Sequence, residues 1–184
     1  MKKLLLSLLV VVFAFTQLHA QESVFKKGDK VVNLGIGFGS TWGLGLYEKT
    51  AVPAISASME VGIVSLLNDK ATIGVGGYIG YSSFKSSISS TYYWTNSDLI
   101  IGARGAFHYA LLDKLDTYAG LILGARIESW KEHGTGYGFT HSTGSGIASS
   151  EFVGARYYFS NSFAVMGELG YGITWLNLGV ALKF

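Results

Sequence analysis

The stretch that decides the fold is LNLGVALKF, residues 176–184. Its even-numbered positions carry Leu, Leu, Val, Leu and Phe, whereas its odd-numbered positions carry Asn, Gly, Ala and Lys. A period of two is the period of a β-strand, in which neighbouring side chains point to opposite faces. The chain therefore ends on a strand with one apolar face and one small or polar face, and Phe184 belongs to the apolar face.

The same alternation runs through most of the chain. In residues 32–38, Val, Leu, Ile and Phe alternate with Asn and Gly, and in residues 55–63 Ile, Ala, Met and Val alternate with Ser, Glu and Gly. No stretch shows the 3.6-residue period of an amphipathic helix. The pattern predicts eight strands, at roughly residues 32–38, 55–63, 71–81, 98–109, 117–130, 147–159, 163–171 and 174–184.

The composition is unusual for a soluble domain. The 184 residues are 49% hydrophobic and only 14% charged, whereas soluble domains carry roughly 25% charged residues. No internal stretch reaches the roughly 18 apolar residues of a membrane-spanning helix. The chain has no Cys, which excludes a disulfide scaffold and an acylated lipoprotein.

The first twenty residues have the pattern of a secretory signal peptide. Lys2 and Lys3 precede an apolar run, and the small residue Ala20 precedes Gln21. We expect cleavage after Ala20 and a single domain over residues 21–184. Loss of the two lysines lowers the formal charge from +2 to 0, so no nucleic-acid partner is expected.

The connections between the predicted strands alternate in length. Residues 66–70, 110–116 and 160–162 are short connections, whereas residues 40–53, 82–97 and 131–146 are long. In an up-and-down barrel, alternate connections lie at the same end, which gives the short turns and long loops typical of bacterial outer-membrane barrels. The last connection, near Gly172, is short where this order predicts a long one.

A soluble β-sandwich also alternates apolar and polar residues. The second face of these strands carries mostly Gly, Ser and Ala, which suits the crowded interior of a small barrel better than a face in contact with water. Aromatic residues also gather near both strand ends, as in a membrane protein. Near the long loops these are Trp42, Tyr81, Trp94, Trp130, Tyr171 and Trp175, and near the other end they are Phe107, Tyr109, Tyr118, Tyr157, Phe159, Phe163 and Phe184.

The terminal Phe184, with Leu178, Val180 and Leu182, resembles the C-terminal assembly signal of bacterial outer-membrane proteins. Together with the signal peptide and the eight strands, residues 21–184 resemble the small outer-membrane barrels of the OmpA and OmpX transmembrane-domain type. This resemblance implies an all-β, eight-stranded antiparallel up-and-down transmembrane β-barrel in the bacterial outer membrane. Its partners would be outer-membrane lipid and lipopolysaccharide, with periplasmic chaperones and the barrel-assembly machinery during biogenesis. A closed sheet has no free edge, so a monomer is expected.

Strand parity places charged side chains on the inner face, where they can pair. We expect an ion network that fills the lumen, and a narrow channel for ions or small solutes is the alternative. Replacement of Arg126 by Leu is expected to destabilise the barrel more than it alters permeability. The predicted network comprises Glu60, Asp98, Arg104, Arg126, Glu128, Arg156 and Glu168, with His108 and Lys183 on the same face.

A lipid A-modifying enzyme is a more remote alternative. One deacylase family uses a His and a Ser two residues apart with a Glu further on, but here Ser142 directly follows His141 and the residue two along is Thr143. Glu151 is the corresponding acid. We expect a polar loop, no enzyme, no metal site and no cofactor.

The long loops are the best candidates for contact with a partner. Residues 82–97 and 131–146 are rich in Ser, Thr, Gly and aromatic residues. Their aromatic side chains could supply adhesive contacts or serve as interfacial anchors. The candidates are Tyr92, Tyr93, Trp94, Tyr137 and Phe139.

Overall fold

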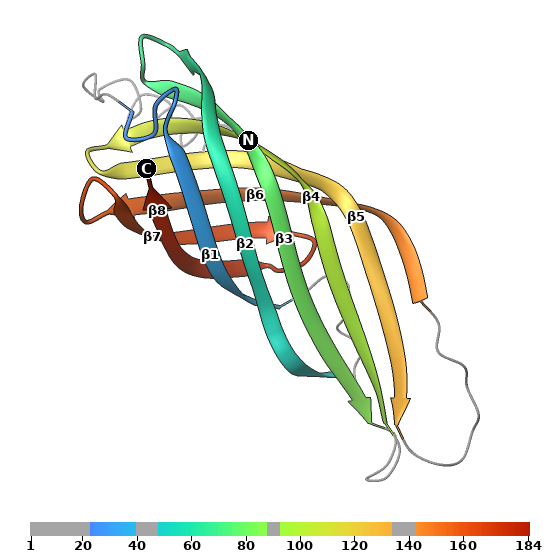
Figure 1. Cartoon of the computed structure of the whole chain (residues 1–184). Helices are drawn as coiled ribbons and strands as arrows, with labels where there is room; N and C mark the ends of the chain where they lie inside the picture. Colours follow the sequence, from blue (N-terminus) through green and yellow to red (C-terminus); the bar gives the residue numbers. More distant parts are fainter. Residues whose placement is uncertain (1–22, 40–47, 88–92, 134–142) are drawn as a thin grey trace, which may run out of the picture.

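The computed structural model describes residues 23–39, 48–87, 93–133 and 143–184. Eight strands form one closed antiparallel barrel in which each strand pairs with its sequence neighbour and β1 pairs with β8 (Figure 1). The predicted fold class is confirmed, whereas the predicted signal peptide lies outside the described residues. The strands are β1 (Lys30–Phe38), β2 (Glu48–Leu66), β3 (Ala71–Ser87), β4 (Tyr93–Leu112), β5 (Leu115–His133), β6 (Thr143–Tyr158), β7 (Phe163–Tyr171) and β8 (Leu176–Lys183).

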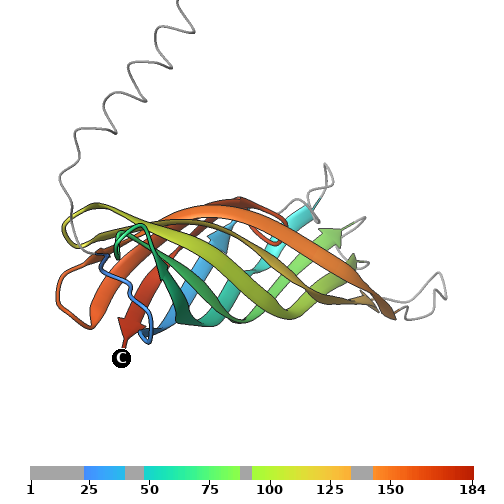
Figure 2. The same ribbon diagram turned by 90° about the horizontal axis from the view of Figure 1, so that it is seen from above.

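The barrel has two different ends. Short turns at residues 67–70, 113–114 and 159–162 lie at one end with the C-terminus, and we call this the turn end (Figure 2). The opposite end, where the predicted long loops begin, is the loop end. No helix in the described residues is long and apolar enough to cross a membrane.

The strands are longer at the loop end than the sequence predicted. β3 and β4 remain paired from Ser82–Asp98 up to Ser87–Tyr93, so most of the predicted loop at residues 82–97 is strand. The Ser, Thr and aromatic residues there resemble a loop in composition but suit a pleated surface. In contrast, β7 and β8 have only 9 and 8 residues because the connection at residues 172–175 is short. The barrel wall is therefore high over β2 to β6 and low over β7, β8 and β1 (Figure 1).

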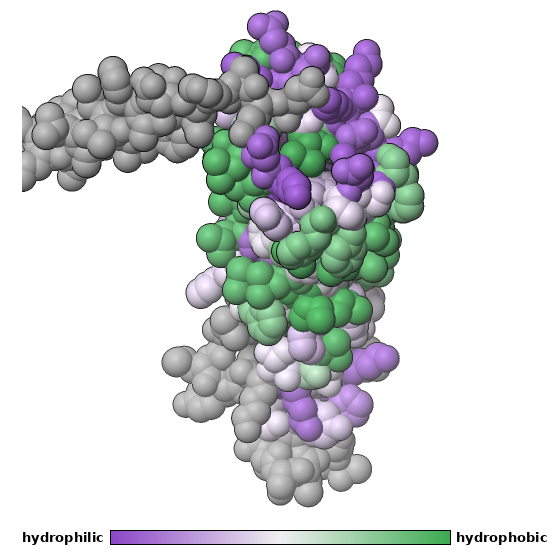
Figure 3. Space-filling view, turned by 90° about the vertical axis from the view of Figure 1, so that its left-hand side faces the viewer, coloured by the Kyte–Doolittle hydropathy of each residue, from purple (hydrophilic) through white to green (hydrophobic). Residues whose placement is uncertain are grey.

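The outer face of the barrel is apolar and exposed. Leu34, Ile36 and Phe38 alternate on β1 with the buried Val31, Asn33, Gly35 and Gly37. Figure 3 shows hydrophobic residues around the middle of the barrel on the face in view and hydrophilic residues toward both ends. Burying this surface in lipid removes an exposed apolar patch that a soluble monomer would not tolerate.

Three aromatic residues that the sequence assigned to interfacial girdles point inward instead. Tyr118 is buried in the lumen, and Trp94 and Trp130 occupy the face of β4 and β5 that also carries the buried Asn96. The girdle prediction considered only how far each aromatic residue lies along its strand. Whether a side chain faces the lipid or the lumen depends on its odd or even position in the strand. Among the outward aromatics at the turn end, the rings of Tyr157 and Phe159 pack edge to face with centroids 5.3 Å apart.

Close approach of β2 and β3 depends on a glycine. A Cβ on Gly76, which faces the lumen, would overlap the carbonyl oxygen of Met59 on β2. On the outward-facing Gly77 a Cβ would meet nothing within 4 Å. Gly76→Val should therefore cost at least about 1–3 kcal/mol of the free energy of unfolding, measured by urea titration in lipid vesicles. Gly77→Val is the matched control, and an equal loss in both variants would contradict the close-approach explanation.

Candidate functional site

The lower half of the lumen holds six ionisable side chains in contact with one another, which we call the lower cluster. Arg104 donates to Glu168 at 2.5 Å and to Glu60 at 3.4 Å. Arg156 is fully buried and pairs with Glu60, and it also donates to Asp116 at 3.2 Å. The members are Glu60, Arg104, His108, Asp116, Arg156 and Glu168.

His108 joins two carboxylates of the lower cluster. Its Nδ1 lies 3.0 Å from Asp116 and its Nε2 lies 2.8 Å from Glu60. Only the imidazolium form can donate to both carboxylates. In that form three cations face three carboxylates, so the charges of the lower cluster balance.

Aromatic rings pack against the two guanidinium groups. The guanidinium of Arg104 lies 3.8 Å from the centroid of the Phe152 ring, and that of Arg156 lies 4.6 Å from the Tyr118 ring. Tyr118 also donates its hydroxyl to Glu168 at 2.9 Å. These contacts desolvate the ions and fix their positions, which favours pairing over passage of a solute.

The sequence prediction missed Asp116. It was assigned to a connection over residues 110–116, but β4 runs to Leu112 and β5 begins at Leu115, so a two-residue turn at Asp113 and Lys114 joins them. The charged run DKLD is typical of a turn. The signal that could have found it is parity, because Asp116 shares a face of β5 with Tyr118.

A second group of polar side chains, the upper cluster, lies toward the loop end. Arg126 donates to Asp98 at 2.7 Å and approaches Glu128 at 3.4 Å. Asn96 donates to Glu128 at 3.2 Å. The Arg126 side chain is 23% exposed, whereas Arg156 is completely buried. The predicted residues thus divide into two groups, with Asp98, Arg126 and Glu128 in the upper cluster.

Apolar side chains fill the space between the two clusters. On β4, Ile100 lies between the inward-facing Asp98 and Arg104, and on β5 Ile122 lies between Tyr118 and Arg126. We call this group the apolar layer. It consists of the buried residues Ala54, Tyr78, Ile100, Ile122, Ala148, Phe152 and Ile173, and the buried Ala106 and Tyr118 continue it to the level of the lower cluster.

Residues 23–29 fold back into the turn end of the lumen and form a plug. Phe25 is fully buried, with its ring 4.4 Å from that of His108. The carbonyl oxygen of Phe25 accepts hydrogen bonds from Thr72 at 2.7 Å and from Ser23 at 2.6 Å. Lys183 donates to the carbonyl of Val24 at 2.8 Å. The plug therefore closes the lumen directly below the lower cluster.

Two further backbone contacts anchor the plug to the barrel wall. The amide of Gly28 donates to the carbonyl of Gly62 at 2.8 Å, and the amide of Gly62 donates to Asp29 at 3.0 Å. Lys183 also lies 3.6 Å from the carboxylate of Asp29. A Cβ on Gly62 would overlap the carbonyl of Lys26, so this position admits the plug because it has no side chain.

Of the residues considered for catalysis, the structure describes Thr143 and Glu151. His141 and Ser142 lie outside the described residues. Thr143 is exposed at the start of β6, and Glu151 is exposed on the outer face of that strand, in register with Tyr171. The residues that the structure describes contain no group of three or more His, Cys, Asp or Glu side chains arranged to hold a metal ion.

The remaining predicted residues are the aromatic loop candidates and the apolar residues of the last strand. Tyr93 and Trp94 belong to β4 and not to a loop, whereas Tyr92, Tyr137 and Phe139 lie outside the described residues. The Tyr93 ring stacks on His133 with centroids 4.6 Å apart. Leu178, Val180, Leu182 and Phe184 all lie on the outer face along the last strand, and Phe184 is at the turn end.

Similarity to solved structures supports the fold at low sequence identity. Ail, the attachment invasion locus protein of Yersinia pestis, has a TM-score of 0.53 at 12% identity, and 86% of this chain and 99% of Ail are covered. The N-terminal β-barrel domain of Pseudomonas aeruginosa OprF has a TM-score of 0.50 at 12% identity, with 86% and 98% covered. The chain has the fold of the small outer-membrane β-barrels. The resemblance predicted from the sequence is thus confirmed for the fold, and the predicted location in the outer membrane agrees with it.

Sequence comparison adds no closer relationship. No family model matches the chain, and no curated protein matches it in sequence.

Proposed function

We propose that this outer-membrane barrel has a closed lumen and acts through its outer surface, in a structural or surface-interaction role. The observation that carries the proposal is the filling of the lumen along its length. From the loop end inward, the upper cluster, the apolar layer, the lower cluster and the plug follow one another. A solute would have to displace the buried Ile100 and Phe25 and separate buried ion pairs.

The high wall over β2 to β6 supports a role at the cell surface. These five strands continue past the short β7–β8 connection and carry the predicted loop segments away from the membrane. Ail, the attachment invasion locus protein, shares this fold at 10–12% identity and has been solved in complex with the heparin analogue sucrose octasulfate. For this chain, adhesion through Tyr92, Tyr137 and Phe139 remains a proposal, as do the assembly machinery and chaperones as biogenesis partners.

Planar-bilayer conductance of refolded residues 21–184 tests the closed lumen. We expect no discrete current steps from barrels whose folding is verified by their resistance to SDS without heating. Reproducible steps that change in Arg104→Ala or Glu60→Ala would contradict the proposal and assign the lumen to a narrow channel.

Adherence of bacteria that express the chain to cultured epithelial cells tests the surface role. We expect replacement of Tyr92, Tyr137 and Phe139 by Ser to reduce adherence, because aromatic side chains such as Tyr are enriched among the few residues that carry most of the binding energy of an interface. The matched control replaces the membrane-facing aromatics Tyr157, Phe159 and Phe163 by Leu, which should leave adherence unchanged. Equal adherence of the two triple variants would contradict a contact role for these residues.

A further inference from the structure

His108 is the point at which the plug meets the lower cluster. The centroid of its ring lies 4.4 Å from that of Phe25 in the plug and 5.1 Å from that of Tyr118. Phe25 and His108 are both fully buried. Gly74 makes room for their contact, because a Cβ there would lie 3.0 Å from the Phe25 ring and 3.1 Å from Nε2 of His108. The plug is therefore seated directly on the imidazole.

The titratable groups around His108 come from several strands. Its two nitrogens face Glu60 of β2 at 2.8 Å and Asp116 of β5 at 3.0 Å. On β3 and in the plug, the nearby Thr72, Gly74 and Phe25 carry no charge. The other titratable groups of this region are Arg104 on β4, Tyr118 on β5, Arg156 and Tyr158 on β6, Glu168 on β7, and Lys183 on β8, which pairs with Asp29 of the plug.

Loss of the proton from His108 disturbs the lower cluster in two ways. A neutral imidazole has one donor and one acceptor, so either Glu60 or Asp116 then faces a lone pair. The three carboxylates of the cluster also face only two guanidinium groups, which leaves one buried charge unmatched. Water from the turn end reaches that charge only when the plug leaves, because the plug closes the lumen directly below the cluster.

We propose that His108 makes the seating of the plug depend on pH, so that rising pH releases residues 23–29 from the lumen. An unmatched carboxylate costs more free energy with the plug seated than with the plug released, so the seated state binds the proton more tightly. The seated state is therefore stable at low pH and is lost as His108 gives up its proton. This device is independent of the adhesive role proposed for the loops, because it lies at the turn end.

Amide exchange of the refolded barrel in detergent micelles, measured by NMR from about pH 6 to about pH 9, tests the proposal. The amides of Ser23 and Gly28 report on the plug, since they donate to Asp69 and Gly62. After correction for the intrinsic effect of pH on exchange, their protection should fall by up to about ten-fold per pH unit, the slope for release of one proton. Amides of β4 and β5 should keep their protection. Protection of Ser23 and Gly28 that does not change with pH would overturn the proposal.

Two variants of the lower cluster should abolish this dependence for different reasons. His108→Gln has no proton to lose in this range. Asp116→Asn leaves two carboxylates and two guanidinium groups, so a neutral imidazole no longer leaves a charge unmatched. Protection of the plug should not fall with rising pH in either variant, and the second variant decides the question if the first does not fold. The parental fall in a folded variant would overturn the role of His108.

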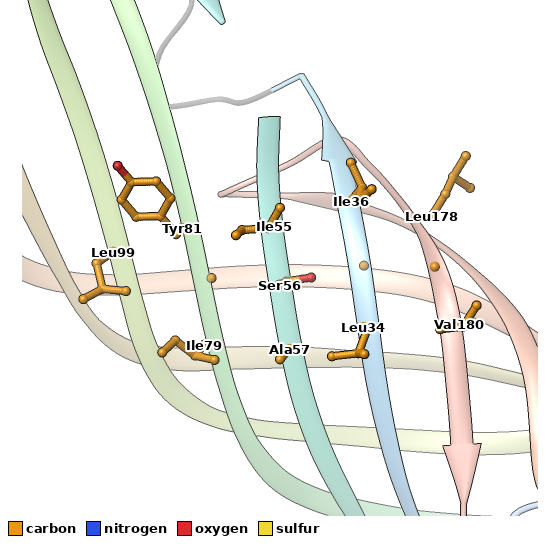
Figure 4. Close-up of a pocket in the computed structure, with 13 residues that line it drawn as sticks. Leu34, Ile36, Ile55, Ser56, Ala57, Ile79, Tyr81, Leu99, Leu178 and Val180 are labelled. Carbon is orange, nitrogen blue, oxygen red and sulfur yellow. The ribbon is translucent and has the colours of Figure 1, made fainter. Parts of the chain in front are cut away.

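Replacements outside the lower cluster serve as matched controls. His133→Gln removes an exposed imidazole near the loop end, where the ring stacks on Tyr93. Ala57→Leu changes the same strand as Glu60, but on the outer face, where Ala57 lines an apolar groove of about 620 Å³ (Figure 4). Both controls should keep the parental fall in protection. Its loss in either control would show that the effect does not arise in the lower cluster.

Planar-bilayer conductance at about pH 9 separates this proposal from that of the closed lumen. The apolar layer still fills the lumen when the plug is released, so we expect loss of plug protection without current steps. Current steps together with an unchanged protection of Ser23 and Gly28 would contradict both proposals. Current steps together with the expected loss of protection would contradict the closed lumen and support the release of the plug.

Discussion

Replacement of Arg156 by Leu should lower the free energy of unfolding by about 3–5 kcal/mol, because it removes one partner from a buried ion network. Arg156 is fully buried and lies between Glu60 and Asp116. Leucine fills part of the volume but leaves both carboxylates facing one fewer cation inside the barrel. Urea titration in lipid vesicles, followed by the loss of SDS resistance, measures the change.

Arg126→Leu is the matched control within the same lumen. Its guanidinium is 23% exposed and pairs with Asp98 and Glu128 near the loop end. The carboxylate of Glu128 is 27% exposed, so water can solvate it when the arginine is lost, whereas Asp98 is buried. We expect a cost of about 1–2 kcal/mol, which is smaller than that of Arg156→Leu. The sequence predicted that Arg126→Leu destabilises the barrel, and the burial of Arg156 gives Arg156→Leu the larger expected effect. Equal losses in the two variants would show that burial does not determine the stability of the network.

Addition of Asp116→Asn to Arg156→Leu tests whether unmatched charge is the cause. The double variant removes one of the two carboxylates that Arg156 leaves behind. It should recover part of the stability lost in the single variant, which is a coupling typical of residues in one network. A further loss of stability in the double variant would contradict this explanation.

The fold could be predicted from the sequence because the barrel repeats one local rule. Side chains alternate between lipid and lumen along every strand, so the period of two in residues 32–38 and 176–184 assigns each face without knowledge of the partner strand. The same parity identified Glu60, Arg104 and Arg156 as lumen residues. It could not identify their partners, because these depend on the relative heights of strands far apart in the sequence. Arg156 and Glu60, for example, are 96 residues apart.

The ends of the strands and the plug could not be predicted for a different physical reason. Ser83 and Ser97 look like loop residues one by one, and only their mutual pairing makes them strand. Residues 23–29 have no strand period, so nothing local indicates that Phe25 enters the lumen. Its place depends on space left by Gly74, where a Cβ would lie only 3.0 Å from the Phe25 ring. That space exists only after the barrel closes.

Replacement of Phe25 by Ala should release the plug while the barrel stays folded. The ring is fully buried against His108, and truncation of a buried Phe costs about 3 kcal/mol or more. That cost corresponds to at least about a hundred-fold increase in local opening. Amide exchange at Ser23 and Gly28, whose amides donate to Asp69 and Gly62, should accelerate by this factor. Trypsin cleavage after Lys26 or Lys27 should accelerate as well.

The outward-facing Phe38 provides the control, since Phe38→Ala removes the same ring from β1 without touching the lumen. It should leave exchange at Ser23 and Gly28 unchanged, and equal acceleration in both variants would contradict the plug's dependence on Phe25.

Planar-bilayer conductance distinguishes release of the plug from opening of the lumen. Ile100, Ile122 and Phe152 still fill the apolar layer when the plug leaves the lumen. The Phe25→Ala variant should therefore show no discrete current steps. Current steps in this variant would instead show that the plug alone closes the lumen and that the apolar layer admits ions.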